Sequence, residues 1–163
     1  MARAGASLSL KARAINLLSR REHSRSELRA KLAPHAENEA ELDALMVELE
    51  KDNWLSQERF AESLVHRRAA RHGTRRILQE LRRHDLSEEA IAGLADSLRA
   101  SELDRAREVW LKRFGNLPSD PKEYARQYRY MAARGFAPDC LRRILAEQGR
   151  ASSEAASFHE PEF

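Results

Sequence analysis

The sequence contains few of the residues from which β-sheets are usually built. Of its 163 residues only eight are β-branched: three valines, four isoleucines and one threonine. Alanine and leucine, which favour helices, number 26 and 21. The composition therefore predicts an all-α protein, and the length suits one domain or one array of small units.

Apolar runs and cysteines are also scarce. No run approaches the roughly 20 apolar residues of a membrane helix. The first 14 residues hold three cations but lack the apolar segment of a secretory signal. Cys140 is the single cysteine, which permits no internal disulfide and makes no recognisable metal site. We therefore expect a cytoplasmic protein without membrane contact.

Motifs of catalysis and of cofactor binding are missing from the sequence. The six glycines form neither G-x-G-x-x-G nor a P-loop, which argues against a nucleotide-phosphate cradle. His66 and His72 lack the i, i+4 spacing of a zinc site, and we expect both to be solvated. Ser24 has a helix-capping role available, so a nucleophilic role is disfavoured. The sequence predicts a protein that is no enzyme and has no cofactor, metal or small-molecule substrate.

What the sequence does contain is an internal repeat. A helical stripe at i, i+3, i+4 and i+7 begins at Leu42 and recurs 49 residues later, at Ile91, and after 50 more, at Leu141. Only Gln148, at the end of the third stripe, is polar. The same offsets relate three further triplets: Leu28, Ile77 and Gln127; Leu32, Leu81 and Met131; and Ile15, Leu64 and Phe114. Chance matches in an Ala/Leu-rich chain would not share one offset, so we infer three tandem three-helix repeats of about 50 residues.

Capping signals place the helices within these repeats. Ser24 and Glu27 form a capping box, and Asp120 before Pro121 is typical of a helix start. Gly115 is predicted to follow a helix end. The predicted repeats span residues 8–53, 54–99 and 100–149, and the predicted disordered ends are an N-terminus at 1–7 and an acidic tail at 150–163.

A unit of about 50 residues buries too little surface to be stable alone, so neighbouring repeats should stack. We therefore predict an elongated array, whose long surface suits a polymer or a filament as partner.

Charge is segregated along the chain. Residues 37–52 carry a net charge of −6 and residues 59–83 a net charge of +6, and 24 of the 29 cations are arginine. Arginine suits phosphate and carboxylate partners because its planar fork binds them bidentately. The basic segments could bind a polyanion or an acidic protein, or could instead pair with the acids of the first repeat. The candidate binding residues are Arg67, Arg68, Arg71, Arg75, Arg76, Arg82 and Arg83, with Arg25 and Arg29 from a second cluster.

Three segments carry a resemblance to a known family. Residues 21–28 read Arg-Glu-His-Ser-Arg-Ser-Glu-Leu, residues 54–61 read Trp-Leu-Ser-Gln-Glu-Arg-Phe-Ala, and residues 134–136 read Arg-Gly-Phe. Together they resemble the signatures of the RecX family, bacterial modulators of the RecA recombinase. The sequence departs from the family pattern at Gln57, where an acid is usual, and near Thr74, where proline is common.

The resemblance implies a non-enzymatic regulator of homologous recombination and DNA repair. Such a protein would lie in the groove of the RecA filament on single-stranded DNA and restrain ATP hydrolysis and strand exchange. Three similar units could each engage one step of a periodic filament, so that weak contacts add. The partner is then the RecA filament, and single- or double-stranded DNA is a second candidate partner whose direct contact the sequence leaves open. A stand-alone helical DNA-binding protein is the alternative.

Overall fold

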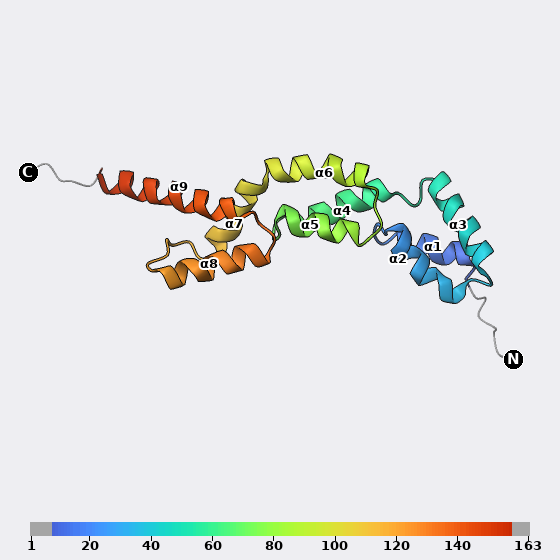
Figure 1. The fold of residues 1–163 in the computed structure, drawn as a ribbon. Coiled ribbons are helices and arrows are strands. Elements are labelled where there is room, and N and C mark those ends of the chain that lie inside the picture. Colours follow the sequence, from blue (N-terminus) through green and yellow to red (C-terminus); the bar gives the residue numbers. More distant parts are fainter. Residues whose placement is uncertain (1–7, 158–163) are drawn as a thin grey trace, which may run out of the picture. The chain divides into compact units, whose positions relative to one another are not determined.

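The computed structural model describes residues 8–157 of the chain, and side chains from 8 to 153. Within these residues it contains nine α-helices, one 3-10 turn and no strand (Figure 1). The all-α prediction is confirmed. The helices are α1 Leu10–Leu18, α2 Arg25–Leu32, α3 Glu39–Lys51, α4 Gln57–Ala69, α5 Thr74–Arg82, α6 Glu88–Ala100, α7 Glu102–Arg113, α8 Pro121–Ala133 and α9 Pro138–Ser157, and the 3-10 turn η1 is Ala33–His35.

The described residues group into two compact units. The N-terminal unit contains residues 8–64 and 81–90, and the C-terminal unit contains residues 65–80 and 91–157. The division between the units passes through α4, α5 and α6, so the second repeat contributes to both.

Helices α1, α2 and α3 enclose the core of the N-terminal unit. Leu28, Leu32, Met46 and Leu49 are fully buried there. Side-chain caps open all three helices: the side chains of Ser9, Ser24 and Asn38 each accept a backbone N–H three residues on. Caps therefore begin the helices, and the leucine stripe determines which face packs inward.

Helices α7, α8 and α9 enclose the core of the C-terminal unit around Trp110. Its buried Nε1–H donates to Gln127 Oε1 at 2.8 Å. Gln127 therefore occupies a core position with its side-chain oxygen hydrogen-bonded. Asp120 caps α8 with Pro121 as its first residue, and Gly115 follows the end of α7 with φ +69°. These three signals act as the sequence predicted.

The repeat register agrees with burial in all three copies. Each member of the Leu42, Ile91, Leu141 triplet is at most 2% exposed. The members of the Leu28 and Leu32 triplets are likewise buried, including the polar Gln127. Three similar three-helix repeats are thus present, as predicted. The elongation of the array stays a prediction.

One end of the last repeat differs from expectation. Helix α9 runs for 20 residues to Ser157, so residues 150–157, predicted to be disordered, are helical. The Ala-, Ser- and Glu-rich composition of this stretch allows a helix to continue without a core stripe. Residues 1–7 and 158–163 lie outside the described residues.

Repeat junctions and candidate binding surfaces

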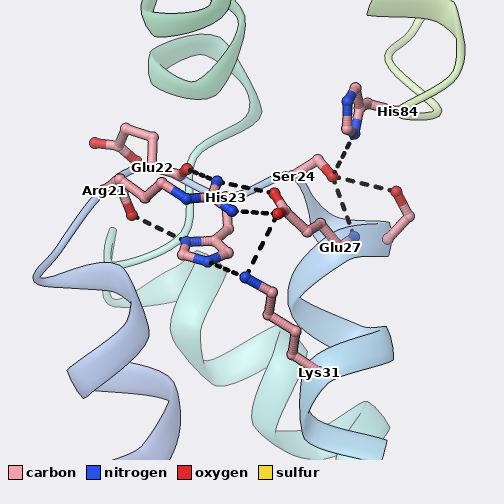
Figure 2. Close-up of polar contacts among 8 residues, drawn as sticks. Arg21, Glu22, His23, Ser24, Glu27, Lys31 and His84 are labelled. Carbon is pink, nitrogen blue, oxygen red and sulfur yellow. Dashed lines mark hydrogen bonds and ion pairs between the residues drawn. The ribbon is translucent and has the colours of Figure 1, made fainter.

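The segment before α2 forms a closed polar cluster in the N-terminal unit (Figure 2). Ser24 is fully buried, and its Oγ accepts the Glu27 N–H at 3.1 Å. The same oxygen lies 3.2 Å from Ser26 Oγ and 3.1 Å from Nδ1 of His84, which follows α5. A single hydroxyl thus caps α2 and ties it to the second repeat.

Ionic partners surround His23 beside that cap. The Arg21 guanidinium binds both oxygens of the Glu27 carboxylate, and this hydrogen bonding lowers the pKa of Glu27 to about 2. His23 is 2% exposed, and its Nδ1 lies 3.0 Å from the Arg21 carbonyl oxygen and its Nε2 lies 3.1 Å from Lys31 Nζ. Burial is the main cause that lowers the pKa of His23. The neutral ring therefore donates its Nδ1–H to the Arg21 carbonyl oxygen, and its Nε2 accepts an N–H from the Lys31 ammonium. These two hydrogen bonds join the turn before α2 to the helix itself.

The first two sequence signatures meet at a junction between repeats. The Arg25 N–H, at the start of α2, donates to Gln57 Oε1 at 3.2 Å. Arg59 Nε donates to Glu22 at 2.8 Å, and its guanidinium also binds the carbonyl oxygens of Asn53 and Trp54. The amide of Gln57 therefore supplies the oxygen that an acid would supply at this position.

The C-terminal unit contains a second junction that follows the same rule. The Thr74 N–H, at the start of α5, donates to Glu102 Oε1 at 2.9 Å. Glu102 is the first residue of α7, as Gln57 is the first residue of α4. In both junctions the second helix of one repeat is capped by the first side chain of the next repeat.

Two glycines bring the backbones together in this second junction. The Gly73 N–H donates to the Arg134 carbonyl oxygen at 2.8 Å, and a Cβ on Gly73 would lie 2.2 Å from the Gly135 carbonyl carbon. Gly135 has φ +84°, and a Cβ there would lie 2.6 Å from Cβ of Arg76. Both positions therefore require glycine.

Most of the candidate arginines have structural partners. Arg75 donates to the Ala132 carbonyl oxygen and Arg76 to that of Ala133, both at 3.0 Å, at the C-terminal end of α8. Arg68 binds the Glu80 carboxylate through two nitrogens. The remaining paired candidates bind acids: Arg25 with Glu50, Arg29 with Glu39 and Asp43, and Arg82 with Glu88.

Three candidate arginines are left without a side-chain partner among the described residues. They are Arg67, Arg71 and Arg83, all exposed. The candidate arginines are thus divided between helix-end capping, ion pairs and unpaired cations. Pairing with acids of the first repeat, the alternative from the sequence, applies to Arg25 and Arg29.

Arg105 is a junction residue that the sequence did not single out. Its guanidinium donates to the carbonyl oxygens of Ala69, His72 and Leu98 and to Thr74 Oγ1. Burial lowers its pKa from the usual value, while Glu102 opposes that shift. One arginine thus satisfies carbonyls at the ends of two helices, α4 and α6.

A basic hollow of about 480 Å³ lies in the C-terminal unit beside this junction. Its polar lining residues are Arg71, His72, Lys112, Arg113, Tyr130 and Arg134. Ala70 and Val109 complete the lining, which includes no acid. Within the structured residues 8–153, none of its four Arg or Lys side chains forms an ion pair. We call this site the basic hollow.

His72 differs from the solvated histidine that was expected, whereas His66 is exposed as predicted. His72 is half-buried, and its buried Nδ1 lacks a hydrogen-bond partner in the described part of the chain. Its pKa is lowered by burial first, and then by the charges of Arg76, Arg68 and Arg134. The expectation of a solvated His72 was wrong because one edge of the ring, with Nδ1, is buried in the C-terminal unit.

The described part of the chain contains no helix long and apolar enough to cross a membrane. It also contains no group of three or more His, Cys, Asp or Glu residues that could hold a metal ion.

A separate family model matches each of the three repeats. Residues 11–49 match the RecX first three-helix domain, residues 56–93 the second and residues 100–145 the third. The chain belongs to the RecX family. Its two junctions are therefore those between the first and second, and the second and third, RecX domains.

Relatives that match over most of their length carry the same family name. The chain is 57% identical to "Regulatory protein RecX" of Ralstonia pickettii (strain 12J), over 85% of this chain and 87% of the relative. It is 48% identical to the protein of that name from Leptothrix cholodnii, over 85% and 88%. The crystal structure of RecX from Lactobacillus salivarius has a similar fold, with a TM-score of 0.68 at 18% identity, over 85% of this chain and 93% of that one. RecX relatives are thus regulatory proteins with this fold.

Proposed function

We propose that this chain binds the RecA filament on single-stranded DNA and inhibits its ATP hydrolysis and strand exchange. The observation that carries the proposal is the presence of all three RecX domains in one chain, each with a buried stripe in the same register. Three linked domains can each contact a successive step of a periodic filament. Regulation of homologous recombination and DNA repair would follow.

Measurement of DNA-dependent ATP hydrolysis by RecA tests this function. We expect inhibition when the chain is present at less than one molecule per RecA protomer, because one chain spans several sites. The matched control is co-sedimentation with RecA in the presence and absence of single-stranded DNA, where we expect capture by the filament. Full ATP hydrolysis at equimolar chain would contradict the proposal.

The unpaired arginines are the part of the candidate set that we propose for binding. Arg67, Arg71 and Arg83 can contact a partner without first breaking an internal ion pair. We expect their triple substitution by alanine to weaken filament capture more than the double change of Arg25 and Arg29, which have acidic partners. Equal losses would contradict this assignment.

A second candidate function is binding of bare DNA, supported by the same unpaired cations. Affinity should then fall linearly with salt on logarithmic axes, with a slope that decreases by about 0.7 for each lost contact to a single strand. Alanine at Arg75 or Arg76 would disturb the end of α8 as well, so the informative substitutions are Arg67, Arg71 and Arg83. A flat salt response would exclude this function.

A further inference from the structure

We propose that the basic hollow binds the phosphodiester backbone of a nucleic acid strand. The inference rests on the proposed function for its setting, because the filament contains single-stranded DNA. It adds three residues that charge clustering in the sequence did not indicate: Lys112, Arg113 and Arg134.

The cations of the hollow have no acidic partner among the side chains that the structure describes. Arg71, Lys112 and Arg113 are exposed, and the structured residues 8–153 offer no carboxylate in ion-pair contact with them. Most other arginines of the C-terminal unit bind an acid or a carbonyl, as Arg68 and Arg107 do. Four like charges around one hollow repel each other, and a bound anion would relieve that repulsion.

Helix capping does not account for the hollow's cations at the ends of α4 and α8, Arg71 and Arg134. Cations often lie at helix C-termini, and α4, α7 and α8 all end near the hollow. At α4 and α8, however, end carbonyls already have donors. Arg105 binds the carbonyl oxygens of Ala69, at the end of α4, and of His72 just beyond it, while Arg75 and Arg76 bind those at the end of α8. Lys112 and Arg113 lie in the last turn of α7, where the helix dipole favours their charge.

Tyr130 holds two of the guanidinium groups in place. The Arg134 Cζ lies 3.7 Å from the centre of the Tyr130 ring, and the Arg113 Cζ lies 5.5 Å from it. Such contacts orient the planar fork and leave its N–H edges free for bidentate contact with a phosphate. Because the guanidinium groups already contact the ring, we expect recognition of the backbone rather than stacking of a base.

The unpaired charge continues beyond the hollow, which favours a polymer as ligand. Arg67 lies four residues before Arg71 and is likewise exposed without a partner in the described chain. Successive phosphates of one strand would meet both side chains. A single carboxylate or a free phosphate would meet only one of them.

His72 reports occupancy of the hollow. Its pKa is lowered in part by the surrounding arginines, and a bound phosphate would offset their charge. In side-chain NMR spectra of the full chain, we expect the pKa of His72 to rise on addition of oligothymidine. The His72→Gln variant assigns the signal, and His23, on the other unit, is the internal control and should not move.

Charge reversal tests the site itself. We expect Arg71→Glu with Lys112→Glu to weaken binding of oligothymidine about tenfold or more and to reduce the salt slope by about 1.4. The matched control is Arg129→Glu with Arg143→Glu, two exposed arginines of the same unit that also lack ion-pair partners within the described residues. This control makes the same change in net charge, and it should weaken the affinity for oligothymidine less than about threefold.

Four results would overturn the inference. They are equal losses in both variants, no loss in either, a His72 response to inorganic phosphate but not to oligothymidine, and equal or better binding of a decaglutamate peptide. The last result would indicate an acidic protein partner instead. The RecA assay separates the two proposals: inhibition without oligothymidine binding contradicts only the hollow, and binding without inhibition contradicts only the proposed function.

Discussion

The turns before α2 and α5 occupy the same repeat position, 49 residues apart, and are closed in different ways. In the first, Ser24 contributes a buried hydroxyl and His23 is hydrogen-bonded at both ring nitrogens. In the second, Gly73 contributes backbone alone, and Nδ1 of His72 has no hydrogen-bond partner among the described residues. Side chains from the next repeat thus cap the second helix in both junctions, but only the second junction also brings two backbones into direct contact, at Gly73 and Gly135.

Placing serine, the residue of the first turn, at Gly73 in the second turn should have the largest effect on stability. In Gly73→Ser, the new Cβ would clash with the backbone of Gly135, and we expect a loss of about 3 kcal/mol in the free energy of unfolding. Urea unfolding followed by circular dichroism measures it. Gly93→Ala is the control, because its Cβ meets nothing within 4 Å inside α6, and it should add about 0.5–1 kcal/mol. Wild-type stability of Gly73→Ser would contradict the close approach.

Removal of the Glu102 carboxylate is expected to have the next largest effect. Glu102→Ala leaves the buried Thr74 N–H without its acceptor, at a cost of about 2–3 kcal/mol. Glu102→Gln retains an oxygen like that of Gln57 and should cost less than about 1 kcal/mol. Both values come from the same urea unfolding experiment. Equal losses would mean that charge, rather than the hydrogen bond, stabilises the junction.

Loss of the Ser24 hydroxyl should have a smaller effect. Ser24→Ala removes the cap of α2 and the contact with His84, and we expect a cost of about 1–2 kcal/mol. Ser87→Ala, an exposed cap with a single 3.2 Å bond to the Ala90 N–H, should cost about 0.5 kcal/mol. A double-mutant cycle with His84→Ala isolates the junction contact. Strict additivity in that cycle would contradict the link between repeats.

The pH dependence should separate His23 from Glu27. Because the folded pKa of His23 lies below 6.5, the unfolded chain takes up a proton first, and stability falls as pH drops below about 6.5. The Glu27 contribution is present above 4.5 and is lost as pH falls toward 2.

Urea midpoints at pH 7.5, 5.5 and 3.5 measure both contributions. His23→Gln should reduce mainly the first loss and Glu27→Gln mainly the second, since each charge also acts weakly on the other group. The variant His72→Gln should reduce a further part of the first loss, since the pKa of His72 is also lowered. If the stability of the wild-type chain were the same at pH 7.5 and 5.5, the buried neutral state of His23 would be wrong.

Local signals in the sequence were sufficient for the helices and their repeat. The stripes beginning at Leu42, Ile91 and Leu141 and the cap at Ser24 depend on residues a few positions apart. The role of Arg105 could not be found this way, because its partner carbonyls lie as far as 36 residues away. The same holds for Arg75, whose acceptor lies 57 residues on.

The sequence by itself determined the helical class, the threefold repeat and which faces are buried, because these follow from periodicity and capping within single helices. Only the tertiary structure decided which arginines cap helix ends and which stay unpaired. The reason is that a guanidinium binds whatever carbonyl or carboxylate lies within its reach, and packing between repeats, rather than position along the chain, determines what lies there.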